Sequence, residues 1–227
     1  MTASMTADSH NKSAKRTYAG QTEAERVHER RERLLEAGLE IFGTLGFQGA
    51  TVRRLCRSAG LTERYFYESF RDLNDLFNAV CERQSARFGE FVLSRLPTLP
   101  TALEARVEGV LRLYFDWMRD KRIVRLLHVE SIALHASGAV ERPRWAEPAQ
   151  MASHLIRVDQ DVQDLPEDVL LAVSLALYGL AATVVTQWTL SDNQLPEEAL
   201  IQGCKISILG TIRELKSRYS GDGSSQA

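Results

Sequence analysis

The chain has 227 residues, enough for one large domain or two small ones, and its composition is that of a soluble globular protein. A formal net charge of −2 excludes a generally basic nucleic-acid coat protein. The charge is uneven, because residues 1–71 hold 12 Lys+Arg against 9 Asp+Glu, whereas residues 72–227 hold 16 against 21. Cys56, Cys81 and Cys204 lie far apart in apolar helical patterns, which favours buried, reduced thiols in a cytoplasmic protein over disulfides or a zinc site.

The chain begins with a polar segment and then becomes helical. Residues 1–20 contain few apolar side chains, so we expect a flexible basic arm that either touches DNA or is an inert solvated tail. The segment lacks the apolar core of a signal peptide, and we do not expect secretion. From Thr22 to Leu45, apolar residues follow one face and charged residues the other, which predicts an amphipathic helix that stops at Gly46.

Residues 51–70, TVRRLCRSAGLTERYFYESF, predict two short helices joined by a tight turn. Gly60 can adopt the positive φ that such a turn needs, and Thr62 stands where the N-cap of the second helix is expected. Phe66 and Phe70 are four residues apart and should face inward. The outer face of the second helix is polar and aromatic, which is typical of a DNA-binding helix-turn-helix but also occurs at a corner between two bundle helices.

A longer helix follows, with Asp72 as its N-cap and Pro97 just beyond its end. Leu76, Phe77 and neighbouring apolar residues form its buried face. At ~1.5 Å per residue, a helix over residues 72–96 spans roughly 38 Å, enough to join a DNA-binding head to a separate body.

Four stretches, in order, carry a resemblance to a known family. They are LLEAGLEIFGTLGFQGATV in the first helix and its turn, AGL in the second turn, TERYFYESF in the second short helix, and RDLNDLF at the start of the long helix. Residues 30–81 thereby resemble the N-terminal domain of the tetracycline-repressor (TetR) family of bacterial regulators. Tyr67, Phe70 and Leu76 stand where this family has Tyr, Phe and Leu. The resemblance implies a DNA-binding homodimer that a small molecule releases from its operator.

The helix from Thr62 to Ser69 would then enter a major groove of double-stranded operator DNA. We assign base or sugar contacts to Arg64 and Tyr65. Glu68 should point away from the phosphates, which repel it, and the direction of Glu63 stays open. Phosphate contacts are assigned to Thr51, Arg53, Tyr67 and Arg71, and Thr62 and Glu63 complete the predicted DNA-contacting set.

The rest of the chain is helical in period, with no alternating strand pattern, so the predicted fold is all-α, a helix-turn-helix domain followed by a helical body. Residues 169–190 are long and apolar enough to cross a membrane. Their flanks are acidic without a Lys/Arg bias, and small residues form a stripe, which favours burial against a partner subunit. The stripe consists of Ala172, Ala176, Gly179 and Thr183.

The last helix, after Pro196, has an apolar seam that we assign, like the stripe, to a dimer interface. Two such helices from each subunit would form a four-helix bundle across a two-fold axis. The resemblance implies the same arrangement, because the TetR family dimerises through its last two long helices. The seam consists of Ile201, Cys204, Ile208 and Ile212.

No catalytic, cofactor-binding or metal-binding motif occurs, so the chain is predicted to be no enzyme and to need no cofactor. His128 and His135 are seven residues apart, but without a third ligand they predict no metal site. Aromatic residues with a few polar groups suit a small-molecule cavity. The residues assigned to a small hydrophobic effector are Trp117, His128, Trp145, Tyr178 and Gln187.

Taken together, the residues and the resemblance to the TetR family predict a cytoplasmic homodimer that binds a palindromic operator, and the resemblance implies that it is a ligand-responsive repressor. Residues 1–20 form its arm, 21–71 the helix-turn-helix domain, 72–220 the effector-binding and dimerisation domain, and 221–227 a tail. Two alternatives stay open. One is a helical membrane-associated protein that uses residues 169–190 as a span, and the other is an enzyme built in a helical bundle.

Overall fold

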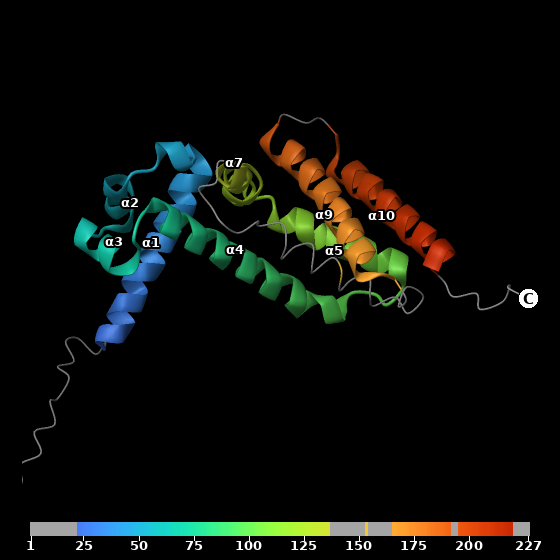
Figure 1. The fold of residues 1–227 in the computed structure, drawn as a ribbon, viewed down its shortest axis with the longest axis horizontal. Coiled ribbons are helices and arrows are strands. Elements are labelled where there is room, and N and C mark those ends of the chain that lie inside the picture. The colour runs from blue at the N-terminus through green and yellow to red at the C-terminus, as the bar shows by residue number, and fades with distance from the viewer. Residues whose placement is uncertain (1–21, 137–152, 154–164, 192–194, 220–227) are drawn as a thin grey trace, which may run out of the picture.

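The computed structural model describes residues 22–136, 153, 165–191 and 195–219, and all regular elements in these ranges are helical (Figure 1). The predicted all-α fold is therefore confirmed. The predicted arm (1–20), the tail (221–227) and Trp145 lie outside the described residues. The elements are α1 (Glu23–Leu45), η1 (Phe47–Gly49), α2 (Val52–Ala59), α3 (Glu63–Ser69), α4 (Leu73–Arg95), η2 (Leu96–Thr98), α5 (Leu103–Trp117), α6 (Lys121–Val124), the π-helical η3 (Arg125–Glu130), α7 (Ser131–Ala136), α9 (Glu167–Leu190) and α10 (Glu197–Tyr219).

The N-terminal head consists of α1, α2, α3 and the start of α4, packed around aromatic rings. Phe42 of α1 is fully buried, and its ring centroid lies 5.2 Å from that of Phe77 in α4 and 5.8 Å from that of Phe47. Phe66 and Phe70 are also buried, as their spacing predicts. Edge-to-face and offset rings add a directional preference to the burial of apolar area. The aromatic cluster therefore fixes how α3 and α4 lie against α1.

Local sequence signals set where these helices begin. The Thr22 hydroxyl accepts from the backbone N–H of Glu25, and the Glu25 carboxylate accepts from that of Thr22, which forms a capping box at the start of α1. At the start of α4, the Asp72 carboxylate accepts from the N–H of Asp75. The 3₁₀ turn η2, which contains Pro97, follows the last residue of α4. This long helix thus begins and ends where Asp72 and Pro97 predict.

The helical body continues from α4. Helix α10 packs along α5, and α9 lies beside α10 (Figure 1). Helix α9 also contacts α6 and η3, which lie against α1. Ion pairs reinforce the α5–α10 contact, with Arg112 Nη2 2.8 Å from a Glu198 oxygen and Lys205 Nζ 2.8 Å from a Glu108 oxygen. One cluster of buried side chains runs from Leu34 in α1 to Cys204 in α10. Head and body therefore share a continuous core.

Helix α9 is the most apolar described helix and also one of the less buried. By length and composition it is the only described helix that could cross a membrane, and 28% of its most apolar window is buried within the chain. A core helix of a soluble protein can meet the same criteria, so this is weak evidence for a membrane span. The exposed apolar area of α9 instead indicates that another surface covers this helix.

The three cysteines are buried, and they form no disulfide bond with one another. This confirms the prediction of buried, reduced thiols. Burial raises the pKa of the Cys56 and Cys204 thiols, so neither is a reactive thiolate at neutral pH.

Candidate nucleic-acid interface

Capping contacts define both ends of α2, and Arg33 of α1 holds the turn between α2 and α3. Thr51 caps α2, because its hydroxyl accepts from the N–H of Arg54 at 3.2 Å. Gly60 ends α2 in the left-handed conformation with a φ of 63°, as predicted. Arg33 of α1 then donates to the carbonyls of Ala59 and Gly60, at 2.5 and 3.2 Å. These bonds satisfy C-terminal carbonyls of α2 and tie the turn to α1.

Helix α3 is anchored by Phe66, whose side chain is fully buried, and by Phe70, which directly follows the helix. Thr62 occupies the N-cap position, but its side chain makes no capping hydrogen bond. The predicted N-cap position of Thr62 is therefore confirmed, whereas its hydroxyl does not cap the helix. Because Thr62 is exposed and its hydroxyl is not used in capping, the hydroxyl is available to a molecule that binds at α3.

Two arginines of α1 support α3 from behind. The guanidinium of Arg30 lies 4.5 Å from the ring centroid of Tyr65, and that of Arg31 lies 4.4 Å from the ring of Phe70. Glu23 holds Arg30 in place through an ion pair of 3.3 Å. Tyr65 is consequently half-buried, whereas the sequence placed it fully on the outer face. The basic run of α1 thus orients α3.

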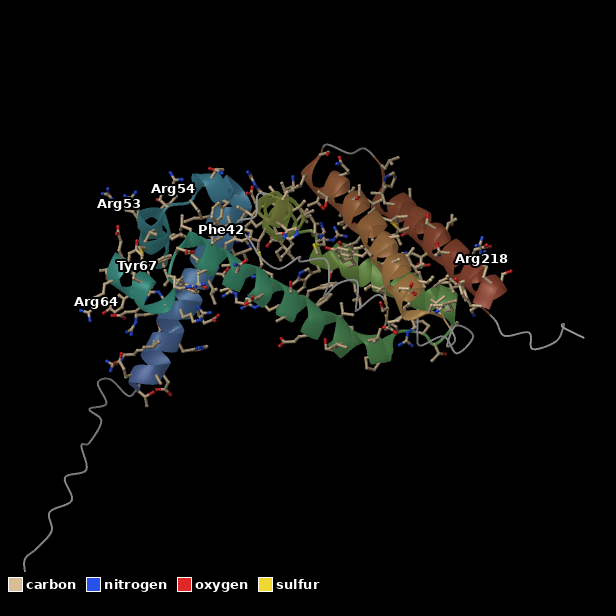
Figure 2. All side chains as sticks on the ribbon, viewed as in Figure 1. Phe42, Arg53, Arg54, Arg64, Tyr67 and Arg218 are labelled. Carbon is tan, nitrogen blue, oxygen red and sulfur yellow. The ribbon has the colours of Figure 1, made fainter. Side chains whose placement is uncertain are left out.

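The remaining predicted DNA-contacting residues lie on the outer side of the head. Figure 2 shows Arg53, Arg64 and Tyr67 projecting from α2 and α3 on the side away from the body. The exposed fraction is 84% for the Arg64 side chain and 60% for Tyr67. The exposed members of the predicted set are Thr51, Arg53, Thr62, Glu63, Arg64, Tyr67 and Arg71. We call these residues, with the half-buried Tyr65, the recognition surface.

Two further arginines of α2 were missed by the sequence reasoning, although they stand in the same basic run. Arg54 is exposed beside Arg53 and donates to the carbonyl of Gly49, which braces the turn before α2 (Figure 2). Arg57 is exposed and forms no ion pair with any described residue. Both extend the positive charge of the recognition surface along α2.

The acidic residues of α3 have different surroundings. Glu68 lies one helical turn after Arg64 and pairs with its Nε at 3.0 Å, so this carboxylate is neutralised within the helix. Glu63 is exposed in the first turn, where the helix dipole favours a negative charge. Its charge also contributes, after burial, to the raised pKa of Cys56. The acidic residues therefore leave the basic character of the surface intact.

Comparison with known proteins identifies this arrangement. The family described as bacterial regulatory proteins, tetR family, matches residues 34–80, which run from the middle of α1 through both helices of the motif to the first half of α4. The chain belongs to the TetR family. It is a DNA-binding transcriptional regulator and not an enzyme.

Relatives extend the likeness beyond the TetR helix-turn-helix domain. The HTH-type transcriptional regulator BetI of Escherichia coli K12 is 27% identical over 163 residues, which cover 70% of this chain and 80% of BetI. A transcriptional regulator from Pseudomonas aeruginosa PAO1 superimposes with a TM-score of 0.71 at 18% identity, covering 88% of this chain and 96% of that one. A TetR-family protein from Mesorhizobium loti gives 0.65 at 14% identity, covering 86% and 99%. At these identities the two structures establish the fold of this TetR body alone.

The TetR body contains a buried polar network centred on His128 of η3. The Thr186 hydroxyl donates to the carbonyl of Ala182 at 2.6 Å, so it accepts from His128 Nδ1 at 2.8 Å. His128 Nε2 must then accept from the Tyr114 hydroxyl at 3.2 Å. Tyr178 packs edge-on against the imidazole, with centroids 6.3 Å apart. The network therefore holds a neutral histidine of defined tautomer.

The other described residues assigned to an effector site differ in burial and in contacts. Trp117 is half-buried, and its ring packs at a tilt against those of Phe88 and Phe91 of α4, at centroid distances of 5.9 and 5.1 Å. Gln187 is exposed and accepts from the Ser191 hydroxyl at 3.2 Å, so it does not face the interior. We therefore revise the prediction for Gln187. No group of three His, Cys, Asp or Glu side chains that could hold a metal occurs in the described part of the chain.

A buried amide in α4 was not anticipated. Gln84 is 2% exposed, and its Nε2 has no hydrogen-bond partner among the described residues. Trp117 Nε1 is a second buried donor without a partner in the described part of the chain. Phe88 lies one turn after Gln84 and contacts Trp117, so both donors border one aromatic cluster between α4 and α5. Buried donors left unpaired cost about 1–3 kcal/mol each, which makes this cluster a candidate site for a ligand with acceptor atoms.

The neutral His128 predicts a stability that depends on pH. Burial lowers the pKa of His128 to about 4, from 6.5 for an exposed histidine. Below pH 6.5 the unfolded chain binds a proton that the folded chain does not, so stability present above pH 6.5 is lost toward pH 4, by up to about 3 kcal/mol. Urea unfolding at pH 7, 6 and 5 should give a steeper loss for the natural chain than for His128→Gln. Equal slopes would contradict the buried neutral state.

The residues assigned to a dimer interface separate into two groups. In α9, Ala172, Ala176 and Thr183 are exposed, and an added Cβ at Gly179 would meet no atom within 4 Å. In α10, the seam of Ile201, Cys204 and Ile212 is buried within the chain, and Ile208 is half-buried. These α10 side chains serve the subunit's own core, because α10 packs on α5. The exposed residues in the middle of α10 are instead Gly203, Ile206, Ser207 and Gly210.

Proposed function

We propose that this TetR-family regulator acts as a homodimeric repressor of a palindromic operator and that a small apolar ligand releases it. The observation that carries the proposal is the recognition surface, an exposed basic and aromatic face on a helix-turn-helix that is braced from within the head. Arg64 and Tyr65 would contact base or sugar edges in the major groove. Thr51, Arg53, Arg57, Tyr67 and Arg71 would contact phosphates, with Thr62 and Glu63 at the groove wall.

The exposed faces of α9 and α10 support a two-fold dimer. Helix α9 leaves a stripe of small residues uncovered, and α10 beside it exposes Ile206 to 69% between Gly203 and Gly210. Side chains absent at the glycines let a second helix approach closely. Two copies of this helix pair would bury the apolar surface of α9 in a four-helix bundle. We therefore move the proposed interface from the buried seam of α10 to its exposed face and keep the α9 stripe.

A charge in this face is expected to separate the subunits. Ile206→Glu should raise the dimer dissociation constant about 100-fold or more, because two uncompensated carboxylates would be buried near the axis. Sedimentation velocity at micromolar concentration measures the mass. Ile132→Glu is the matched control, since Ile132 is 64% exposed on α7, outside α9 and α10. A monomeric natural chain, or an unchanged mass for Ile206→Glu, would contradict the dimer.

The proposed effector site is the interior cluster of Gln84, Trp117, Tyr114, His128 and Tyr178. Its aromatic walls suit an apolar ligand, and its two unpaired donors suit an acceptor oxygen such as a carbonyl. None of these five residues carries a positive charge at neutral pH, because burial keeps His128 neutral. The cluster therefore favours an uncharged ligand over a carboxylate. Gln84 lies in α4, the helix that joins the head to the body, so a ligand here would contact the element that positions the head.

Gln84→Leu tests the site because it removes the amide donor while nearly preserving volume. Compounds made or consumed by the products of neighbouring genes are titrated against Trp117 fluorescence and against operator binding. The variant should bind an active compound at least ~10-fold more weakly, since a lost buried hydrogen bond costs about 1–2 kcal/mol. Operator affinity without ligand should not change. Full release of the variant at the same concentration would contradict the assignment.

The proposed dimer interface accounts for the apolar surface of α9 without a membrane. Ser174, Ala181 and Val185 are buried within the chain on one side of α9, and a partner subunit would cover the other side. Crossing a membrane would instead remove these side chains from their contacts with the rest of the chain. We therefore propose a cytoplasmic protein, where operator DNA lies, and regard the membrane-associated alternative as disfavoured.

A further inference from the structure

The base of the DNA-binding head is held by body residues that are distant in sequence. The Glu130 carboxylate accepts from the backbone N–H of Phe47 at 3.0 Å through one oxygen, and its other oxygen pairs with Arg125 Nε at 3.2 Å. Arg125 Nη1 also donates to the carbonyl of Thr44 at 2.9 Å. We call Thr44, Phe47, Arg125 and Glu130 the head clamp. It joins the end of α1 to η3 across 83 positions of sequence.

These bonds satisfy groups that the end of α1 cannot satisfy itself. The last turn of α1 contains no basic residue, although its carbonyls carry partial negative charge. Arg125 supplies the positive charge, and Glu130 supplies an acceptor for an amide in the turn that follows. The Glu130 side chain is only 15% exposed. A charge-assisted hydrogen bond sheltered from water is stronger than one on the surface.

The π-helical geometry of η3 makes the clamp possible. Arg125 and Glu130 are five residues apart, and in an α-helix such residues point about 140° apart around the axis. In a π-helix, i→i+5 hydrogen bonding brings them onto one side. The same segment turns His128 toward the interior network with Tyr114 and Thr186. One short element therefore faces the head with Glu130 and the proposed effector site with His128.

Glycines let the head approach the body closely at the clamp. A Cβ on Gly43 would lie 2.4 Å from Arg122 Cβ and 2.7 Å from its Cα. A Cβ on Gly46, where φ is +76°, would lie 2.6 Å from a Glu130 carboxylate oxygen. Arg122 adds an ion pair of 2.8 Å to Glu40 of α1. The contact leaves little freedom for the head to tilt.

We propose that Glu130 is a positioning residue that fixes the orientation of the head and so sets the spacing between the two recognition helices of a dimer. The inference rests on the proposed dimeric binding to a palindromic operator. Glu130 does not contact DNA. It acts through the Phe47 amide and the end of α1, and its neighbour His128 connects the clamp to the interior site.

The test measures spacing preference rather than affinity alone. The natural chain first selects an operator from random DNA, and its half-sites are then separated by spacers that differ by single base pairs. The natural chain should prefer one spacing at least ~10-fold, and Glu130→Ala should reduce this preference to about 3-fold or less. Binding to a single half-site should stay within about 2-fold, because no DNA contact is removed. Hydrogen exchange of the Phe47 amide, measured without DNA, should become at least ~10-fold faster in Glu130→Ala.

Two further variants separate positioning from stability. Glu198→Ala removes a carboxylate that pairs with Arg112 between α10 and α5, away from the head, and should keep the spacing preference. Glu130→Gln retains an acceptor for Phe47 but not the charge for Arg125, so it should fall between Glu130→Ala and the natural chain. It also carries the test if Glu130→Ala does not fold. A preserved preference, an unchanged Phe47 exchange rate, or an equal loss in Glu198→Ala overturns the proposal. Failure of the natural chain to select DNA refutes the proposed function instead, and the exchange rate still decides the clamp.

Discussion

Replacing Arg64 and Tyr65 together by alanine is expected to weaken operator binding at least ~100-fold. A bidentate arginine–base contact discriminates by about 1–3 kcal/mol, and a two-fold dimer loses the contact twice. Arg64 is accessible for this contact, because its side chain is 84% exposed near the start of α3. Its pairing with Glu68 holds the guanidinium on the outer side of the helix before DNA arrives. Fluorescence anisotropy at a fixed salt concentration, with operator and with scrambled DNA, measures the specific loss.

Arg218 provides the matched control for Arg64. It pairs with Glu214 one turn away, as Arg64 does with Glu68, but lies at the opposite end of the molecule (Figure 2). Arg218→Ala should leave both affinities unchanged. The double variant should bind scrambled DNA only a few-fold more weakly, because the phosphate-contacting residues remain. Operator affinity equal to that of the natural chain would refute the assignment of Arg64 and Tyr65.

The structure of the N-terminal head could be predicted from the sequence, because the signals that determine its helices and turns are local. Gly60 at a left-handed turn, Asp72 at an N-cap and the four-residue spacing of Phe66 and Phe70 depend on neighbouring positions, and each forms as predicted. The resemblance to the TetR family rests on the same short-range pattern. It could not reveal that Arg30 stacks on Tyr65, since that contact depends on how α1 crosses α3.

The packing of helices that are distant in sequence could not be predicted from the sequence. A stripe of apolar residues shows that a helix has a buried face but not which neighbour covers it. The sequence assigns the α10 seam of Ile201 and Ile212 to a partner subunit, whereas both side chains are buried within the same chain, in which α10 packs against α5 and α9. In the same way, a glutamine in an apolar helix can face inward or outward. Gln187 faces out at the end of α9, while Gln84, in a helix of mixed composition, is almost fully buried.

The π-helical segment has no sequence signature comparable to a cap or a turn. Residues 125–130 read as an ordinary stretch of amphipathic helix, and the single extra residue per turn changes which side chains share a face. Glu130 is a polar residue in this stretch, and the local pattern does not show what its side chain contacts. Its partner proved to be a backbone amide of the head. Contacts of this kind couple two regions that fold from separate patterns.

Phe42→Ala is expected to destabilise the chain by about 3–5 kcal/mol, the cost of removing a fully buried phenylalanine from a packed core. The Phe42 ring is 0% exposed and contacts the rings of both Phe77 and Phe47, so its loss leaves a cavity where α1 meets α4. Chemical denaturation followed by circular dichroism measures the free energy of unfolding. Leu45→Ala, in the same helix at a side chain 48% exposed, should cost less than about 1 kcal/mol.

The shape of the Phe42→Ala transition carries as much information as its midpoint. Because one cluster of buried side chains runs from α1 to α10, the loss should lower a single transition for the whole chain. The head clamp works in the same direction, since Phe47 packs on Phe42 and its amide is held by Glu130. Two separate transitions in the variant would mean that the head unfolds alone and that its orientation is set only weakly by the body. A destabilisation below about 1 kcal/mol would contradict the central place of Phe42 in the core.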